Sequence, residues 1–296
     1  MAAGREVLMS QSMISHVSDT AIWVAHFRAE ETRRADALFQ DPLATRLTGS
    51  KGKEIARQMA AEQFTAWSVV IRTCIIDAYI RELIASQGVD LIVNLGAGLD
   101  TRPYRMDLPA SLRWVEVDFP HLIEFKNRTL QEEKPRCQLS RVSLDLSNRP
   151  ARLQFLSEAC ASADRVLVLM EGVVPYLPAT EVALLAADFR AQKQIQFWIV
   201  DYFSPTVMSF FTRGRWQRQL KNAPFQFMPK DWFQFFSQNG WSPREIRYLT
   251  IESAKLGREL PLPFWAKWIP SLLPAKQREA IQKFSAYVLL EPNKKE

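Results

Sequence analysis

The sequence has few of the features that mark secreted, membrane or metal-binding proteins. It contains three widely spaced cysteines, which argues against a disulfide framework or a structural zinc site (Cys74, Cys137 and Cys160). Charged residues interrupt the apolar segments Val69–Ile80 and Val166–Leu177, so neither offers the ~18 apolar residues of a membrane helix. Met1–His16 lacks a cationic start followed by an apolar core, so we expect no secretory signal. These absences predict a cytoplasmic protein that has no membrane partner and binds no metal.

The charge balance gives little indication of a partner. The net charge is +6 and the isoelectric point is near 9.3, which allows an anionic partner without requiring one. The basic residues are spread along the chain and no RNA-binding motif is present, so we expect no nucleic-acid partner. Aromatic residues are plentiful at 11%, and many of them fall between residues 202 and 240.

Short apolar segments alternate with helical segments from residue 90 to residue 203. We predict strands over residues 90–95, 114–119, 137–144, 165–174 and 195–203, with helices over 121–133, 151–162 and 178–192. Helices are also expected over 18–38 and 53–86, and two late strands over 245–251 and 284–290. This alternation predicts a parallel sheet with helices on both faces and ligands at the carboxyl ends of the strands.

A glycine turn follows the first predicted strand directly. Its residues are Gly96-Ala97-Gly98-Leu99-Asp100, and glycine lets a backbone approach a ligand closely. A dinucleotide-binding turn would carry a third glycine where this chain has Thr101, which weakens a nicotinamide interpretation. A connection between strand and helix that binds nothing is the alternative.

Acidic residues close the second and third predicted strands. Asp118 ends the second strand, where an acid can accept hydrogen bonds from both ribose hydroxyls. Asp145 ends the third, next to Leu146, where a carboxylate could accept from an adenine amino group while a neighbouring backbone N–H donates to the ring. Capping of the following helix is the alternative at both places, and a solvent-exposed acid at the strand end is a further alternative for Asp118.

Two further charged residues lie in apolar surroundings. Glu171 interrupts the fourth predicted strand, where burial requires a cationic ligand or a structural arginine as its partner. Arg72 lies in the helix before the first strand, and its forked guanidinium suits a carboxylate. A solvent-exposed position on the helix is the alternative for Arg72.

Three segments together resemble the leucine carboxyl methyltransferase family, in particular its bacterial polyketide O-methyltransferase branch of the tetracenomycin type. They are Val93–Arg102 (VNLGAGLDTR), Val115–Pro120 (VEVDFP) and Glu171–Leu177 (EGVVPYL). Asp41-Pro42-Leu43-Ala44 and Arg72-Thr73 fit as well, and the order and spacing are kept over residues 18–205.

The resemblance implies a class I methyltransferase fold and S-adenosyl-L-methionine as the cofactor. This fold is an α/β, Rossmann-like sheet of seven strands, mostly parallel, with an antiparallel last strand. We expect residues 1–88 to form a helical N-terminal cover, and residues 89–296 a core with lid insertions at about 204–240 and 252–282. By resemblance, Arg72 pairs with the methionine carboxylate, Gly96 lies against the methionine portion and Glu171 lies near the methionine amino group. Asp118 holds the ribose, and Asp145 and Leu146 address the adenine. Gly98 also binds the cofactor, and Arg28 is the basic N-terminal contact.

The aromatic and basic residues after the fifth strand indicate where an acceptor binds. An apolar lid with basic residues suits a small, largely apolar, anionic molecule, and packing of a helical subdomain is the alternative. The predicted acceptor contacts are Tyr176, Tyr202, Phe210, Arg213 and Trp216.

Methyl transfer depends on in-line positioning, and a carboxylate acceptor is already ionised at neutral pH. No general base stands out, and Tyr176 and His121 are the candidates. We therefore expect an O-methyltransferase that forms a methyl ester. Hydroxyl methylation of a polyketide or polyketide-peptide intermediate, an RNA-binding or RNA-modifying protein, and a non-catalytic cofactor-binding protein are the alternatives. The sequence leaves the oligomeric state open.

Overall fold

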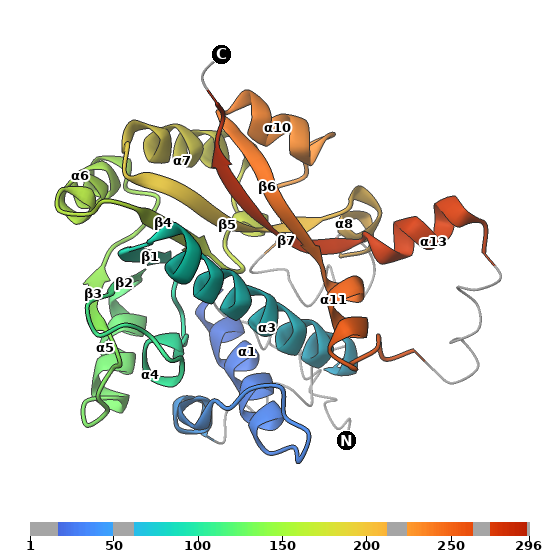
Figure 1. The fold of residues 1–296 in the computed structure, drawn as a ribbon, viewed down its shortest axis with the longest axis horizontal. Helices are drawn as coiled ribbons and strands as arrows, with labels where there is room; N and C mark the ends of the chain where they lie inside the picture. Colours follow the sequence, from blue (N-terminus) through green and yellow to red (C-terminus); the bar gives the residue numbers. More distant parts are fainter. Residues whose placement is uncertain (1–16, 50–61, 212–223, 263–272, 295–296) are drawn as a thin grey trace, which may run out of the picture.

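A seven-stranded sheet forms the centre of the computed structural model, which describes residues 17–49, 62–211, 224–262 and 273–294 (Figure 1). The strand order is β3-β2-β1-β4-β5-β7-β6. Strands β1 to β5 pair in parallel, and β7 runs antiparallel to both of its neighbours. The predicted sheet with its antiparallel last strand is therefore confirmed. The strands are β1 (Leu91–Leu95), β2 (Arg113–Asp118), β3 (Gln138–Ser143), β4 (Val166–Met170), β5 (Ile195–Phe203), β6 (Trp241–Tyr248) and β7 (Ser285–Pro292).

The parallel strands lie where their apolar runs predict them. Every residue of β1 and β4 is buried, because helices cover both faces of the middle of the sheet. The predicted strand over 245–251 is wrong at both ends. Strand β6 already begins at Trp241, and the chain turns into helix α11 (Leu249–Lys255) after Tyr248. Pro243 lies in the first half of β6, where the register with β7 is irregular. Because proline cannot donate a hydrogen bond to a sheet, the sequence of this half did not indicate a strand.

Helices pack against both faces of the sheet. On one face lie α6 (Arg149–Cys160), α7 (Ala179–Ala191) and α10 (Trp232–Gln238), whose apolar side chains form a cluster around Trp198. The rings of Phe189, Phe236 and Trp241 all meet the Trp198 ring edge-on. Several aromatic residues of the segment 202–240 therefore belong to the core, among them Phe227, Trp232 and Phe236. The other face is covered by α3 (Glu62–Gln87) and α11.

The N-terminal helix α1 (Val17–Thr32) lies beside α3, near the carboxyl ends of the strands (Figure 1). Arg258, which follows α11, forms ion pairs with Glu31 and Asp36, and its carbonyl accepts a hydrogen bond from Trp67. These contacts tie the late part of the chain to the N-terminal helices. The predicted division at residue 88 stays a prediction.

A helix also spans residues 42–49, and further short helices lie along the described chain. They are α4 (Arg102–Arg105), the 3-10 turn η1 (Val174–Tyr176), α5 (Pro120–Thr129), α8 (Pro205–Phe211) and α13 (Ala275–Gln282). Within the described residues, the structure has no helix with the length and apolar character needed to cross a membrane.

Candidate active site

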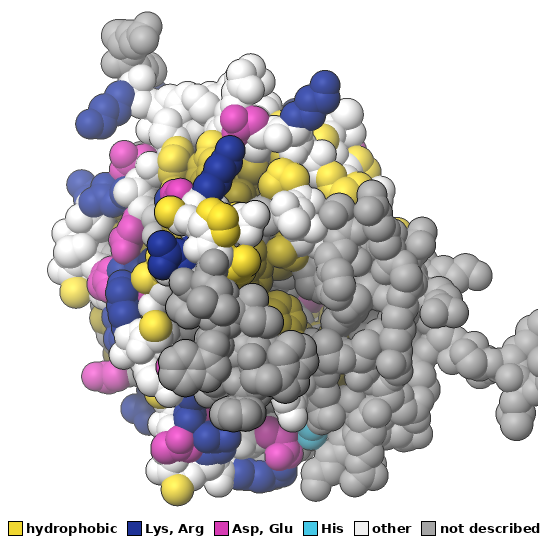
Figure 2. All heavy atoms as spheres, turned by 90° about the vertical axis from the view of Figure 1, so that its right-hand side faces the viewer, with side chains coloured by type: hydrophobic (Ala, Val, Ile, Leu, Met, Phe, Trp, Pro, Cys, Tyr) yellow, Lys and Arg dark blue, Asp and Glu magenta, His cyan; other side chains and the backbone are white. Residues whose placement is uncertain are grey.

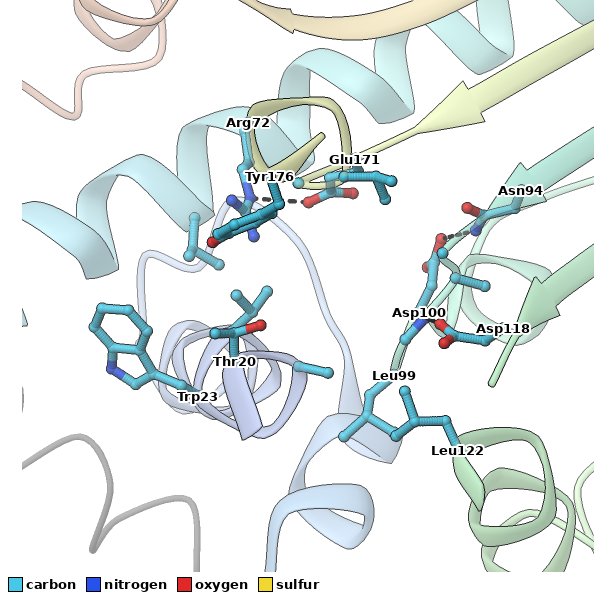
Figure 3. Close-up of a pocket in the computed structure, with 18 of the residues that line it drawn as sticks. Thr20, Trp23, Arg72, Asn94, Leu99, Asp100, Asp118, Leu122, Glu171 and Tyr176 are labelled. Atoms are coloured by element: carbon cyan, nitrogen blue, oxygen red, sulfur yellow. Dashed lines mark hydrogen bonds and ion pairs between the residues drawn. The ribbon is translucent and has the colours of Figure 1, made fainter. Parts of the chain in front are cut away.

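A cavity of about 570 Å³ opens at the carboxyl ends of β1 to β4 (Figure 3). Helices α1 and α3 contribute one side of it, and the turns after the strands contribute the other. All eight residues predicted to bind the cofactor line this cavity, although they come from segments far apart in the chain. They are Arg28, Arg72, Gly96, Gly98, Asp118, Asp145, Leu146 and Glu171.

The glycine turn after β1 can be built only with glycine at its first position. Gly96 has φ +71°, and a Cβ there would lie 2.4 Å from Cγ2 of Val173 in the turn after β4. Side chains rarely adopt this backbone conformation, and the contact leaves no room for one. The turn therefore brings bare backbone to the wall of the cavity.

Asp118 fixes the glycine turn to the end of β2. Its Oδ2 accepts a hydrogen bond from the Gly98 N–H at 2.6 Å, and its Oδ1 accepts from the Phe119 N–H at 2.7 Å. Helix α5 has no side-chain cap at Phe119, so the capping alternative for Asp118 is wrong. Burial raises the pKa of Asp118, although its hydrogen bonds oppose the shift. A ligand hydroxyl that donates to this carboxylate would stabilise its charged form.

The turn after β3 carries Asp145 and Leu146. The Asp145 carboxylate accepts a hydrogen bond from the Ser147 N–H at 2.9 Å. The cap of α6 is instead Asn148, whose side chain accepts from the Ala151 N–H, so the capping alternative for Asp145 is wrong as well. The Leu146 carbonyl accepts from Arg152, which anchors this turn to α6.

Arg72 and Glu171 form an ion pair across the upper wall of the cavity in Figure 3, with 2.8 Å between Nε and Oε1. Both side chains are largely buried, so the solvent-exposed alternative for Arg72 is wrong. Glu171 also accepts a hydrogen bond from Arg102 at 2.9 Å. Burial alone would raise the pKa of Glu171, but the Arg102 and Arg72 guanidinium groups outweigh it and lower the pKa. Glu171 therefore stays ionised in the cavity wall.

Arg102 is the residue that the sequence analysis missed. It is buried, and its guanidinium also contacts Asp77 at 2.7 Å and Asp100 at 2.8 Å. One side chain thus connects α3, the glycine turn and the end of β4. The sequence did offer one indication: Asp77 is an acid among the apolar residues of α3, and a buried acid requires a cation nearby.

Arg28 joins α1 to the glycine turn. Its Nε pairs with Asp41 at 2.8 Å, and its Nη2 donates to the Leu99 carbonyl. The side chain is buried and lines the cavity, and its contact with the cofactor stays a prediction.

The predicted acceptor contacts separate in the structure. Tyr176 lines the cavity, and burial raises the pKa of its phenol to about 12. Tyr202 instead faces α10, where its ring contacts Trp232 and Phe233. Helix α8 includes Phe210, but its side chain lies outside the described residues, as do Arg213 and Trp216.

Phe203 and Phe225 line the cavity in positions that were not singled out as acceptor contacts. The side chains of consecutive strand residues point to opposite faces of the sheet. Phe203 therefore lines the cavity, whereas the adjacent Tyr202, which was predicted to do so, points away from it. His121 is exposed, stacks on Phe119 with 5.9 Å between ring centroids, and is not among the cavity residues. Among the described residues, no cluster of histidine, cysteine and acidic side chains has the makings of a metal site.

A sequence model of leucine carboxyl methyltransferases matches residues 21–189, more than half of the chain. The chain belongs to the leucine carboxyl methyltransferase family. This membership confirms the predicted family and the predicted cofactor, S-adenosyl-L-methionine. The branch within the family stays a prediction.

Relatives of this family member carry the name putative S-adenosyl-L-methionine-dependent methyltransferase. One from Streptomyces avermitilis is 37% identical over 191 residues, which cover 60% of this chain and 66% of the relative. One from Frankia alni is 28% identical over 263 residues, covering 82% and 90%. The matches to the first relatives thus span about two thirds or less of their length.

A solved structure from Thermobifida fusca, titled a putative methyltransferase, has the same fold. It superposes on this family member with a TM-score of 0.55 at 10% identity, over 98% of this chain and 100% of that one. The class I methyltransferase fold is thereby confirmed.

Proposed function

We propose that this chain transfers the methyl group of S-adenosylmethionine to an oxygen atom of a small, largely apolar acceptor. The observation that carries the proposal is that the eight residues predicted to bind the cofactor line one cavity at the carboxyl edge of the sheet. Such edges are where open α/β sheets bind their ligands.

The polar and charged residues around the cavity suit each portion of the cofactor in turn: methionine, ribose and adenine. Arg72 and Glu171 offer a cation and an anion on one wall, which complement the carboxylate and ammonium of the methionine portion (Figure 3). Asp118 lies on another side of the cavity, where it would accept from the ribose hydroxyls. Asp145 and Leu146, in the turn after β3, would address the adenine. When bound, the cofactor supplies an electrophilic methyl group on its sulfonium.

Neither of the two predicted general bases supports methylation of a hydroxyl group. Tyr176 is a poor base at neutral pH because its phenol keeps its proton up to about pH 12. His121 does not line the cavity. A carboxylate needs no base, so the protein's task is to exclude water and hold the oxygen in line with the methyl group. Tyr176, Phe203 and Phe225 supply an apolar surface for that purpose. Methyl ester formation is therefore the proposed reaction, ahead of hydroxyl methylation.

Replacing Asp118 tests the cofactor assignment. The Asp118→Ala variant should lose affinity for S-adenosylmethionine in calorimetry, because each hydrogen bond to a charged group contributes about 1.5–3 kcal/mol. Asp107→Ala, at an exposed aspartate, is the matched control and should bind like the unchanged protein. Equal affinities of the two variants would contradict the ribose assignment.

The acceptor chemistry is tested with a metabolite extract. The protein is incubated with the extract and methyl-labelled cofactor, and labelled products are identified by mass spectrometry. An ester releases labelled methanol in base, whereas a label stable to base would reject the carboxylate acceptor.

A further inference from the structure

A second cavity, of about 270 Å³, lies next to the first at the carboxyl end of β5. Its lining is largely apolar, with Asp201 and Lys230 as the charged members, and comes from η1, β5, α8, α10 and the segment before α10. The lining residues are Pro175, Asp201, Phe203, Pro205, Met208, Phe227, Met228, Pro229, Lys230 and Trp232. Met228 and Lys230 are exposed, so the cavity reaches the surface there. Figure 2 views the molecule from the side of α8 and α13, where hydrophobic side chains gather in the upper part of the face.

The two cavities share a wall. Phe203 lines both of them, and its ring stacks on Phe225, which lines the main cavity, with 6.1 Å between centroids. The Phe225 ring in turn contacts Tyr176 at 5.0 Å. The Pro175 carbonyl accepts hydrogen bonds from the backbone N–H groups of Gln226 and Phe227, which hold this segment against η1. The Phe203 ring and its neighbours therefore lie between the two cavities.

The main cavity is too small for two ligands of drug size. Cavities that hold one such ligand measure roughly 300–1,000 Å³, and S-adenosylmethionine is itself of that size. With about 570 Å³, the main cavity has room for the cofactor and the reacting end of an acceptor. The rest of a larger acceptor needs other space, and the second cavity is adjacent.

The second cavity suits an uncharged, hydrophobic group. Its one buried acid, Asp201, already accepts hydrogen bonds from the Tyr287 hydroxyl at 2.7 Å and from the Gly172 N–H at 3.0 Å. The remaining inner surface is aromatic, proline and methionine, and methionine adapts its shape to irregular apolar groups.

We propose that the second cavity is an acceptor subsite that binds the hydrocarbon body of an elongated carboxylic acid. The carboxylate lies in the main cavity, the chain passes beside the Phe203 ring, and the far end points towards Met228 and Lys230. Met208, on α8, is then a residue that determines acceptor length. This assignment rests on the proposed function, because it needs a cofactor in the main cavity.

Binding of saturated fatty acids tests the subsite without knowledge of the natural acceptor. The protein is first saturated with S-adenosylhomocysteine, and the affinities of octanoate and dodecanoate are measured by calorimetry. Each buried methylene raises affinity about fourfold. Dodecanoate has four more methylenes than octanoate, so it should bind roughly 250-fold more tightly when the subsite buries all four, and more than about tenfold more tightly when it buries two. The Met208→Trp variant, which fills the subsite, should lose this preference and keep its affinity for octanoate and S-adenosylhomocysteine.

Two further variants keep the test decisive. Leu153→Trp, at an exposed leucine of α6 that lines neither cavity, should keep the full preference for dodecanoate. Met208→Ala enlarges the subsite and should shift the preference towards tetradecanoate, which provides a result even if Met208→Trp does not fold. The inference is overturned if the unchanged protein binds S-adenosylhomocysteine but shows no chain-length preference, or if Met208→Trp and Leu153→Trp behave alike. Failure to bind S-adenosylhomocysteine at all would instead overturn the proposed function.

Discussion

The two halves of the proposed site are built in opposite ways. The half predicted to hold the cofactor is polar, and ion pairs of Arg72, Arg102 and Glu171 connect its turns. The half proposed for the acceptor consists of rings that pack on one another, among them Phe203 and Phe225. Directional bonds require particular residues at particular positions, whereas apolar packing accepts many combinations of similar volume. One framework can therefore keep its cofactor while its acceptor changes.

Removing Arg102 should produce the largest effect on the polar half. The Arg102→Ala variant leaves Asp77, Asp100 and Glu171 without their shared partner. Loss of one partner from a buried ion pair costs about 3–5 kcal/mol, and we expect a decrease of that size in the free energy of unfolding in urea. The matched control is Arg46→Ala, whose ion pair with Glu133 is substantially exposed and should contribute below about 1 kcal/mol. Equal losses in the two variants would show that Arg102 does not hold these segments together.

A pH effect should arise where the two halves meet, at Asp201. Burial raises the pKa of Asp201 to about 6, although Tyr287, Arg72 and the Gly172 N–H oppose the shift; Glu171 raises the pKa further. The folded protein therefore holds a proton that the unfolded chain, with a pKa of about 3.9, releases. The stability due to Asp201 is fully present below about pH 4 and is lost as the pH rises through 6.

The Asp201→Asn variant stays neutral and should escape this loss. Relative to the unchanged protein, its free energy of unfolding should improve by roughly 2–3 kcal/mol between pH 4 and pH 7. Urea unfolding at several pH values measures the difference, and Asp107→Asn, at an exposed aspartate, is the matched control. A constant difference across this pH range would contradict the raised pKa.

The smallest expected effect lies in the apolar half. Phe225→Leu removes ring contacts with Tyr176 and Phe203, and aromatic pairs contribute about 0.5–1.5 kcal/mol. We expect a decrease of about 1 kcal/mol in the free energy of unfolding, with the affinity for S-adenosylhomocysteine changed less than about twofold. A tenfold loss of that affinity would mean that the apolar half contributes to cofactor binding.

The fold could be predicted where burial leaves a simple pattern. Strands β1, β4 and β5 are apolar runs because helices cover both of their faces. The first half of strand β6 is polar apart from Trp241 and contains Pro243, so its beginning was not visible. The chain also forms a helix at Leu249–Lys255 where β-branched residues favoured a strand, because α11 packs against α3 and the sheet. Tertiary packing decided these cases over local preference.

The place of the acids in the polar half was predictable because they end or follow strands: Asp118 ends β2, and Asp145 lies in the turn after β3. The role of Arg102 could not be predicted. The local sequence of a short helix does not indicate whether an arginine in it is exposed or buried. In the apolar half, the face of β5 decides whether Tyr202 or Phe203 meets the cavity, and an apolar run on a strand buried on both sides does not reveal its register.

Strand β7 has a consequence for the order in which the molecule can assemble. It lies between β5 and β6, and β6 has no other neighbour in the sheet. The ribosome makes β6 before β7, so β6 must wait, unpaired, for the strand that separates it from β5. Tyr287 also belongs to β7, and its hydroxyl is the partner of Asp201 beneath the turn that carries Gly172. The nascent chain can therefore complete this edge of the site only after its last strand has been synthesised.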